Sequence, residues 1–152
     1  MIRFSLVMAT RGRDAEITAF CDSLVAQGRR DAELIVVDQN EDDRVLAVLS
    51  RFTGTLDWTH LRSPVPHANR ARNAGLRAAR GALVAFPDDD CLYPPGTLDR
   101  VAAVFDADPS LGLLTGPAAS PAGGLGSGRW RADAGPIDAA SVWTSVIEFN
   151  LW

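Results

Sequence analysis

The stretch ELIVVD at residues 33–38 is a near-continuous apolar run that ends in an acid. Such a run is typical of a parallel strand covered on both faces, because a solvated face would introduce alternating polar side chains. A similar run, FSLVMA, precedes it at residues 4–9, and another, ALVAF, follows at residues 82–86. The three runs predict buried strands of one sheet.

Segments with helical spacing separate these runs. Helices are expected near residues 17–25, 45–52, 69–80 and 98–105, and further strands at residues 56–61 and 111–115. Strands that alternate with helices are joined by right-handed crossovers. The sequence therefore predicts an α/β fold with a mostly parallel sheet flanked by helices.

The composition fits one ordinary domain. The chain has 152 residues, of which 47% are hydrophobic, and this is enough to build a core. Residues 118–128 are rich in Gly, Ala, Ser and Pro and show no periodicity. We therefore expect an α/β domain at residues 1–117, followed at residues 118–152 by a flexible loop and the start of an incomplete segment.

Charge and hydropathy exclude several classes of protein. The formal net charge of -4 argues against a nucleic-acid partner, because such proteins carry a basic surface. All 15 basic residues are arginines, so phosphate recognition must use arginine, backbone N–H groups or a metal. A signal peptide and a transmembrane segment are not apparent. We expect a cytoplasmic protein and leave peripheral attachment to the inner face of the membrane open.

Three consecutive acids follow the run at residues 82–86. Asp88, Asp89 and Asp90 repel one another at such spacing, and a divalent metal would relieve the repulsion. In an extended segment Asp88 and Asp90 would face the same side and share one ion. Oxygen ligands favour Mg²⁺ or Mn²⁺, with water and substrate phosphates completing the coordination. The alternative is a solvated turn or helix cap.

Two other strand and helix ends are chemically useful. Asp38 ends its strand, where it either caps the next turn or accepts hydrogen bonds from a base or ribose. Arg72 and Asn73 are expected at the start of a helix, where the helix dipole and a guanidinium favour a diphosphate. His60 and His67 lack the spacing of metal ligands, and we interpret them as ordinary structural histidines.

Four blocks carry a family resemblance. They read SLVMATRGR, ELIVVDQ, ARNAGLRAARG and LVAFPDDDCLYPPG, and they resemble in order and spacing the signature blocks of family 2 glycosyltransferases. The resemblance covers residue 4 to about residue 105. It implies the A-type glycosyltransferase fold, with a Rossmann-like nucleotide-sugar-binding domain. It also implies metal-dependent transfer of a sugar from a nucleoside-diphosphate sugar to a saccharide or lipid-linked acceptor hydroxyl, with inversion at the anomeric carbon.

The resemblance also implies site residues. Thr10 and Asp38 would help to hold the base, and Gln39 replaces an acid often found after that Asp. Asp90 would be the main metal ligand, and Asp88 would share the metal through water. The expected donor-binding residues are Thr10, Arg11, Asp38, Gln39, Arg72, Asn73, Asp88 and Asp89, and the expected ligands of Mn²⁺ or Mg²⁺ are Asp90 and Asp88.

The acceptor side looks incomplete. Inverting transfer needs a general base, which in this family is usually an acid in a later Glu-Asp-type block, and the sequence lacks that block. We expect a nearly whole donor site in a truncated chain, with Glu148 or a partner needed to supply a base. Trp130, Trp143 and Trp152 are candidates for an acceptor subsite, although burial in the core is the more ordinary role of such residues.

Two rival interpretations remain open. A nucleotidyltransferase would carry a Gly-rich loop with a basic residue after its first strand, whereas ATRGR at residues 9–13 has one glycine. A non-catalytic α/β domain that clusters acids around Mg²⁺, such as a phosphate receiver, would place a lysine opposite those acids. The absence of lysine from the sequence argues against this second rival.

Overall fold

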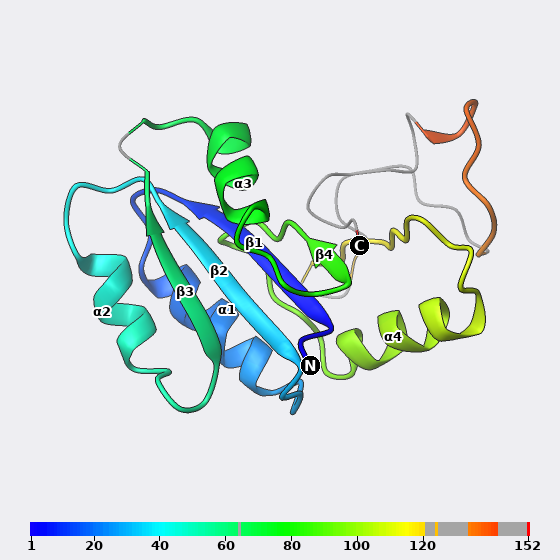
Figure 1. The fold of residues 1–152 in the computed structure, drawn as a ribbon, viewed down its shortest axis with the longest axis horizontal. Coiled ribbons are helices and arrows are strands. Elements are labelled where there is room, and N and C mark those ends of the chain that lie inside the picture. Colours follow the sequence, from blue (N-terminus) through cyan, green and yellow to red (C-terminus); the bar gives the residue numbers. More distant parts are fainter. Residues whose placement is uncertain (64, 121–123, 125–133, 143–151) are drawn as a thin grey trace.

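The computed structural model describes residues 1–63, 65–120, 124, 134–142 and 152. Its elements in chain order are β1 (Phe4–Thr10), α1 (Ala15–Val25), β2 (Ala32–Asp38), α2 (Arg44–Ser50), β3 (Asp57–Arg62), α3 (Ala68–Leu76), β4 (Leu83–Ala85) and α4 (Thr97–Ala107). The strands form one sheet in the order β3-β2-β1-β4, and every neighbouring pair is parallel (Figure 1). The predicted α/β fold is confirmed.

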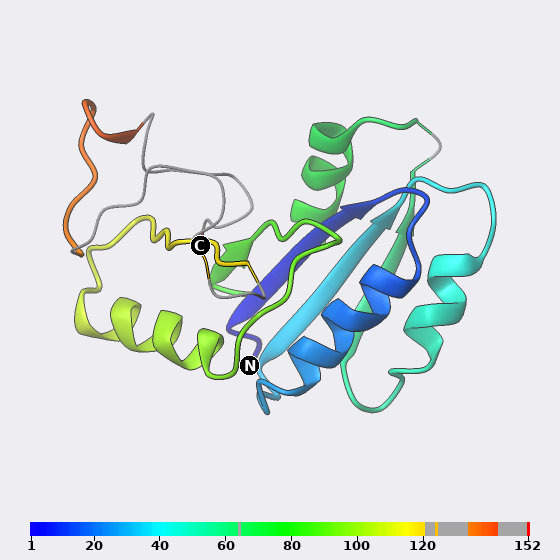
Figure 2. The same cartoon turned by 180° about the vertical axis from the view of Figure 1, so that it is seen from behind.

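The two faces of the sheet are covered by different helices. Alternate residues of β1 and β2, such as Leu6 and Leu34, belong to a core cluster with side chains of α1, α2 and α4. On the opposite face, α3 lies directly over Val7 and Val37 (Figures 1 and 2). A methyl group on Gly75 would lie 2.5 Å from Cγ1 of Val7, so α3 approaches the sheet closely because residue 75 has no side chain.

The helices behind the core follow from their sequence patterns. Asp14 caps α1 by accepting a hydrogen bond from the backbone N–H of Ala15, over 2.7 Å. The predicted apolar face of α1 is buried, and it comprises Ile17, Phe20, Cys21 and Leu24. In α4 the buried residues are Leu98, Val101 and Ala102. Because α1 and α4 are packed on the core, the segments that join β1 to α1 and β4 to α4 are held at the edge of the sheet.

Three predicted elements differ from the structure. The helix expected at residues 69–80 ends at Leu76, because the backbone N–H of Arg80 donates to Oε1 of Glu33, 2.7 Å away. The strand expected at residues 82–86 is reduced to Leu83–Ala85, and Pro87 beyond it has no N–H for a ladder. Residues 111–115 form no strand of the sheet, and the backbone of Leu114 exchanges two hydrogen bonds with Trp152.

Trp152 is a packing residue. Its ring meets Phe4 edge-on, with centroids 5.9 Å apart, and lies 5.4 Å from the ring of Tyr93. Trp130, Trp143 and Glu148 lie outside the described residues, so their suggested roles and the division at residue 117 stay predictions. No helix in the described part of the chain has the length and apolarity needed to cross a bilayer.

Candidate functional site

The carboxyl ends of the strands bring most of the predicted site residues to one edge of the sheet. Thr10 ends β1 and is in register with Asp38, which ends β2. Arg62 ends β3 and is in register with Asp38 on its other side. The acidic turn, Asp88 to Asp90, follows β4, which pairs with β1. Ligands of parallel α/β sheets bind at this edge.

The acidic turn is not extended. The backbone N–H of Cys91 donates to the carbonyl of Asp88 over 3.2 Å, and this bond closes a tight turn. The prediction that this segment is extended is therefore wrong, and the sharing of one metal by Asp88 and Asp90 stays a prediction. Asp88 accepts a hydrogen bond from Arg72 at 2.8 Å, whereas Asp90 pairs with Arg13 at 3.1 Å.

Asp89 is the most firmly held of the three acids. Its Oδ2 accepts a hydrogen bond from the hydroxyl of Thr10 over 2.7 Å, and its Oδ1 lies 3.1 Å from Nε of Arg13. The Asp89 side chain is 14% exposed, compared with 50% for Asp90. Arg13 thus bridges two carboxylates and reduces the repulsion that a metal was expected to relieve.

Arg72 contacts the acidic turn from the middle of α3 and not from its start. Arg72 and Asn73 lie in the middle of α3, and the cap at its start is His67, so the expectation that they begin the helix is wrong. Arg72 is nevertheless only 15% exposed and ion-paired with Asp88. Asn73 is exposed, and its side chain makes no hydrogen bond within the described part of the chain.

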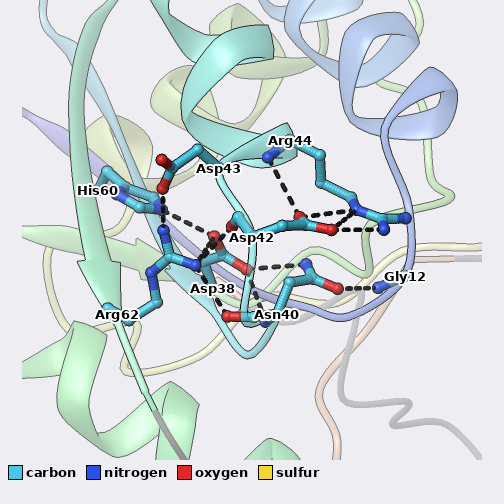
Figure 3. A network of polar contacts seen from close by, with 8 residues as sticks. All are labelled: Gly12, Asp38, Asn40, Asp42, Asp43, Arg44, His60 and Arg62. Carbon is cyan, nitrogen blue, oxygen red and sulfur yellow. Dashed lines mark hydrogen bonds and ion pairs between the residues drawn. The ribbon is translucent and has the colours of Figure 1, made fainter.

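Asp38 is the centre of a buried polar network (Figure 3). Its side chain is fully buried. One oxygen accepts from the backbone N–H and the side-chain amide of Asn40, both at 2.8 Å. The other lies 2.9 Å from Nε2 of His60 and 3.6 Å from Arg62. The Asn40 amide oxygen accepts in turn from the backbone N–H of Gly12 at 2.7 Å.

The remaining predicted residues flank this network. Gln39 accepts a hydrogen bond from the backbone N–H of His67 over 2.6 Å, which ties the end of β2 to the start of α3. Arg11 is exposed, and its side chain forms no hydrogen bond or ion pair with any described residue. Its guanidinium is therefore available to an incoming anion or to the face of a base.

Sequence patterns did not identify four residues of this edge: Arg13, Asn40, His60 and Arg62. Arg13 stands one position before the cap of α1, between the strand predicted at residues 4–9 and the helix predicted at residues 17–25. His60 was interpreted as structural, and its contact with a buried carboxylate depends on the pairing of β2 with β3. The acids of the turn need a cation, but this requirement does not distinguish Arg13 from the other arginines of the sequence.

Cys91, which follows the acidic turn, is a poor nucleophile, because burial and the adjacent carboxylates of Asp88 and Asp90 raise the pKa of its thiol.

The acidic turn offers ligands for a cation. Among the described residues, no three His, Cys, Asp or Glu side chains could together hold a metal. One or two carboxylates suffice for Mg²⁺ or Mn²⁺ when phosphates and water complete the shell. The half-exposed Asp90 fits that requirement.

A cavity of about 530 Å³ opens beside the acidic turn. It lies between α4 and residues 114–119, and apolar side chains dominate its lining. Its lining includes Asp90, Tyr93, Val101, Val104 and Trp152. Asp90, the most exposed acid of the turn, thus lies between the polar residues at the strand ends and this mostly apolar cavity.

Known proteins share this sequence pattern. The model of glycosyl transferase family 2 matches residues 5–131. An uncharacterized glycosyltransferase of Haemophilus influenzae is 29% identical over 115 residues, which are 75% of this chain and 38% of that protein. A PGL/p-HBAD biosynthesis glycosyltransferase of Mycobacterium bovis is 32% identical over 111 residues, 70% of this chain and 43% of that protein. The chain thus spans less than half the length of these relatives.

Solved structures share the fold. Staphylococcus aureus TarS 1-349 in complex with UDP-GlcNAc superposes with a TM-score of 0.82 at 21% identity, over 99% of this chain and 45% of that one. The mannosyltransferase PcManGT from Pyrobaculum calidifontis, in complex with GDP-Man and Mn²⁺, gives a TM-score of 0.69 at 25% identity, over 79% and 36%. With its acidic turn at the carboxyl edge and a family match over most of its length, this chain belongs to glycosyl transferase family 2.

Proposed function

We propose that this chain forms the donor site of a glycosyltransferase that moves a sugar from a nucleoside-diphosphate sugar to an acceptor hydroxyl, with a divalent metal and with inversion. The observation that carries the proposal is the acidic turn after β4, fixed to β1 through Thr10 and Asp89. The complexes of TarS with UDP-GlcNAc and of PcManGT with GDP-Man and Mn²⁺ support a ligand of this class.

The acidic turn would hold the metal and the diphosphate. Asp90, the most exposed acid of the turn, is the proposed main ligand of Mn²⁺ or Mg²⁺, and Asp88 shares the ion through water. Asp89 lies toward the ribose and diphosphate, held in place by Thr10. The metal, when bound, neutralises the negative charge that develops on the departing nucleoside diphosphate.

The other predicted residues would bind the rest of the donor. Arg72 compensates the charge of Asp88 and is proposed to reach the diphosphate, with Asn73 beside it in α3. Asp38 is fully buried, so we propose that it contributes through the groups that cover it. The donor-binding set is Thr10, Arg11, Asp38, Gln39, Arg72, Asn73, Asp88 and Asp89.

The proposed reaction also needs an acceptor and a general base. Inverting transfer requires a base that takes the proton of the acceptor hydroxyl as the new bond forms. We propose that the saccharide or lipid-linked acceptor approaches the donor past Asp90, on the side of the apolar cavity. The base would come from residues 118–152, from a further segment or from a partner.

Calorimetric titration with UDP, GDP and dTDP tests the donor site, each with Mn²⁺ and again with excess chelator. We expect saturable binding of one nucleotide that requires the metal, and loss of that binding in Asp90→Asn. Asp99→Asn is the matched control, because Asp99 is an exposed carboxylate on α4 that pairs with Arg29. Binding of Mn²⁺ with no nucleotide in any titration would contradict the proposal and favour a non-catalytic metal-binding domain.

A further inference from the structure

The loops that follow β1 and β2 are joined by one side chain. The backbone ladder between these strands ends with the hydrogen bond from the N–H of Gln39 to the carbonyl of Thr10, 3.0 Å long. Beyond it, the link continues through Asn40, whose amide oxygen accepts from the N–H of Gly12 at 2.7 Å. Asn40 therefore extends the contact between the loops past the last pair of the sheet (Figure 3).

The orientation of the Asn40 amide is dictated by its two neighbours. A backbone N–H such as that of Gly12 can only donate, so it must meet the amide oxygen. The oxygen of Asp38 that accepts from the backbone N–H of Asn40 also accepts from the amide nitrogen, 2.8 Å away. Because these requirements agree, neither neighbour permits the flipped amide, and Asn40 has one favourable conformation.

The anchor of Asn40 is rigid. Asp38 is in the sheet and fully buried, and His60 fixes its second oxygen from β3, at 2.9 Å. Arg62 closes the far side by donating to the backbone carbonyl of Asn40 over 2.8 Å and by pairing with Asp43. A group held from both sides in this way can position a neighbouring segment, and that segment here is the loop at Gly12.

That loop carries Arg11 of the proposed donor site and Arg13, which contacts the acidic turn. Arg11 is exposed at the sheet edge, and Arg13 contacts Asp89 and Asp90 of the acidic turn, both at 3.1 Å. A continuous series of contacts thus runs from Asp38 through Asn40 and the loop to the acidic turn. It crosses the sheet edge from β2 to the segment after β4.

We propose that Asn40 is a positioning residue for the nucleotide-sugar donor, one that holds the loop at Gly12 so that Arg13 stays paired with the acidic turn; the inference rests on the proposed donor-binding function. Without the amide, the N–H of Gly12 loses its acceptor and the loop is tied to β2 only through Thr10. Arg13 would then sample positions away from Asp89, and the donor would bind a less ordered site.

The test measures nucleotide affinity in Asn40→Ala, Arg13→Ala and the double variant, by calorimetry with Mn²⁺. We expect Asn40→Ala to weaken binding about tenfold, as loss of one well-placed hydrogen bond does. In the Arg13→Ala background the same change should alter affinity less than about twofold, because the loop no longer carries the arginine that Asn40 positions. Arg44→Ala is the matched control, since Arg44 at the start of α2 pairs with Asp42 and makes no hydrogen bond to Gly12.

Two measurements separate positioning from folding. Thermal unfolding of each variant reports stability, and Asn40→Asp serves as a second variant that keeps an acceptor for Gly12 but opposes Asp38 with a like charge. Hydrogen exchange of the Gly12 amide, without nucleotide, should accelerate in Asn40→Ala and stay unchanged in Arg44→Ala. An equal loss of affinity from Asn40→Ala in both backgrounds would overturn the positioning role.

The two proposals fail in different ways. If the wild-type chain binds none of the nucleotides, the donor site itself is refuted and the positioning role with it. If the wild-type chain binds a nucleotide and Asn40→Ala binds it equally well, the donor site stands and only the role of Asn40 is refuted. Slow exchange of the Gly12 amide in Asn40→Ala would refute that role independently of any ligand.

Discussion

The hydroxyl of Thr10 donates a hydrogen bond to Oδ2 of Asp89 over 2.7 Å and so joins the end of β1 to the turn after β4. The two residues are 79 positions apart in sequence. Thr10 is almost completely buried, and the carboxylate of Asp89 is 14% exposed. A hydrogen bond to an ionised acceptor in such a setting is stronger than one between neutral groups.

Thr10→Val removes this hydroxyl and keeps the shape of the side chain. We expect it to lower the free energy of unfolding by about 1–2 kcal/mol, because Asp89 loses a buried donor. Affinity for the bound nucleoside diphosphate should fall roughly tenfold, because the acidic turn is less fixed. Urea denaturation and calorimetry measure the two effects. Thr18→Val is the control, since the Thr18 hydroxyl donates to the backbone carbonyl of Asp14, the cap of α1, and not to the acidic turn.

Arg72→Gln separates recognition of the diphosphate from recognition of the base. We expect affinity for a nucleoside diphosphate to fall about tenfold, because the ion pair with Asp88 and a cation near the phosphates are both lost. Affinity for the corresponding nucleoside should change less than about twofold. The comparison is made by competition binding, with Arg77→Gln as control, an exposed arginine one turn further along. Equal losses for both ligands would contradict this assignment.

Glu33→Gln tests an ion pair between a buried glutamate and the exposed Arg80, at the opposite end of the sheet. Burial acts to raise the pKa of Glu33, but hydrogen bonds from Ser5 and Arg80 outweigh it and hold the pKa below its ordinary value of 4.5. Glu33 is 1% exposed and Arg80 lies 2.6 Å away. Removing the charge at neutral pH should lower the free energy of unfolding by about 2–3 kcal/mol.

The effect of Glu33→Gln should depend on pH with a definite sign. The folded protein binds the proton of Glu33 less readily than the unfolded chain, so the stabilisation is present above about pH 4.5 and is lost as the pH falls further. The difference in stability between wild type and variant should therefore shrink from pH 5 to pH 3. Glu41→Gln, at an exposed position, should show no such change. A constant difference over this range would refute the assignment.

The sequence reveals the frame of the fold because burial leaves a local pattern. FSLVMA and ELIVVD are buried on both faces, and these apolar runs predict the ends of β1 and β2 to within a residue or two. The helix at residues 69–80 was overestimated, because its end depends on Glu33, a residue far away in sequence that captures the N–H of Arg80. A partner at that distance leaves no trace in the local periodicity.

The site was predictable in its residues and less so in its geometry. The acids after the β4 run and the acid that ends β2 do lie at one edge, as parallel strands require. The arginine that bridges Asp89 and Asp90 was not identified, since nothing in TRGR distinguishes Arg13 from a solvated residue. Asn40 was not identified either, because its role depends on hydrogen bonds to Gly12 and Asp38 that form only in the folded chain.

Gly75 sets the height of α3 above the sheet, and through it the reach of Arg72. The helix rests on Val7, where any added carbon would clash, and it carries Arg72 one turn before the point of contact. A larger residue at position 75 would lift the whole helix and draw the guanidinium away from Asp88. The packing of Gly75 against Val7 on one face of the sheet thus determines the position of the Arg72 guanidinium at the carboxyl ends of the strands.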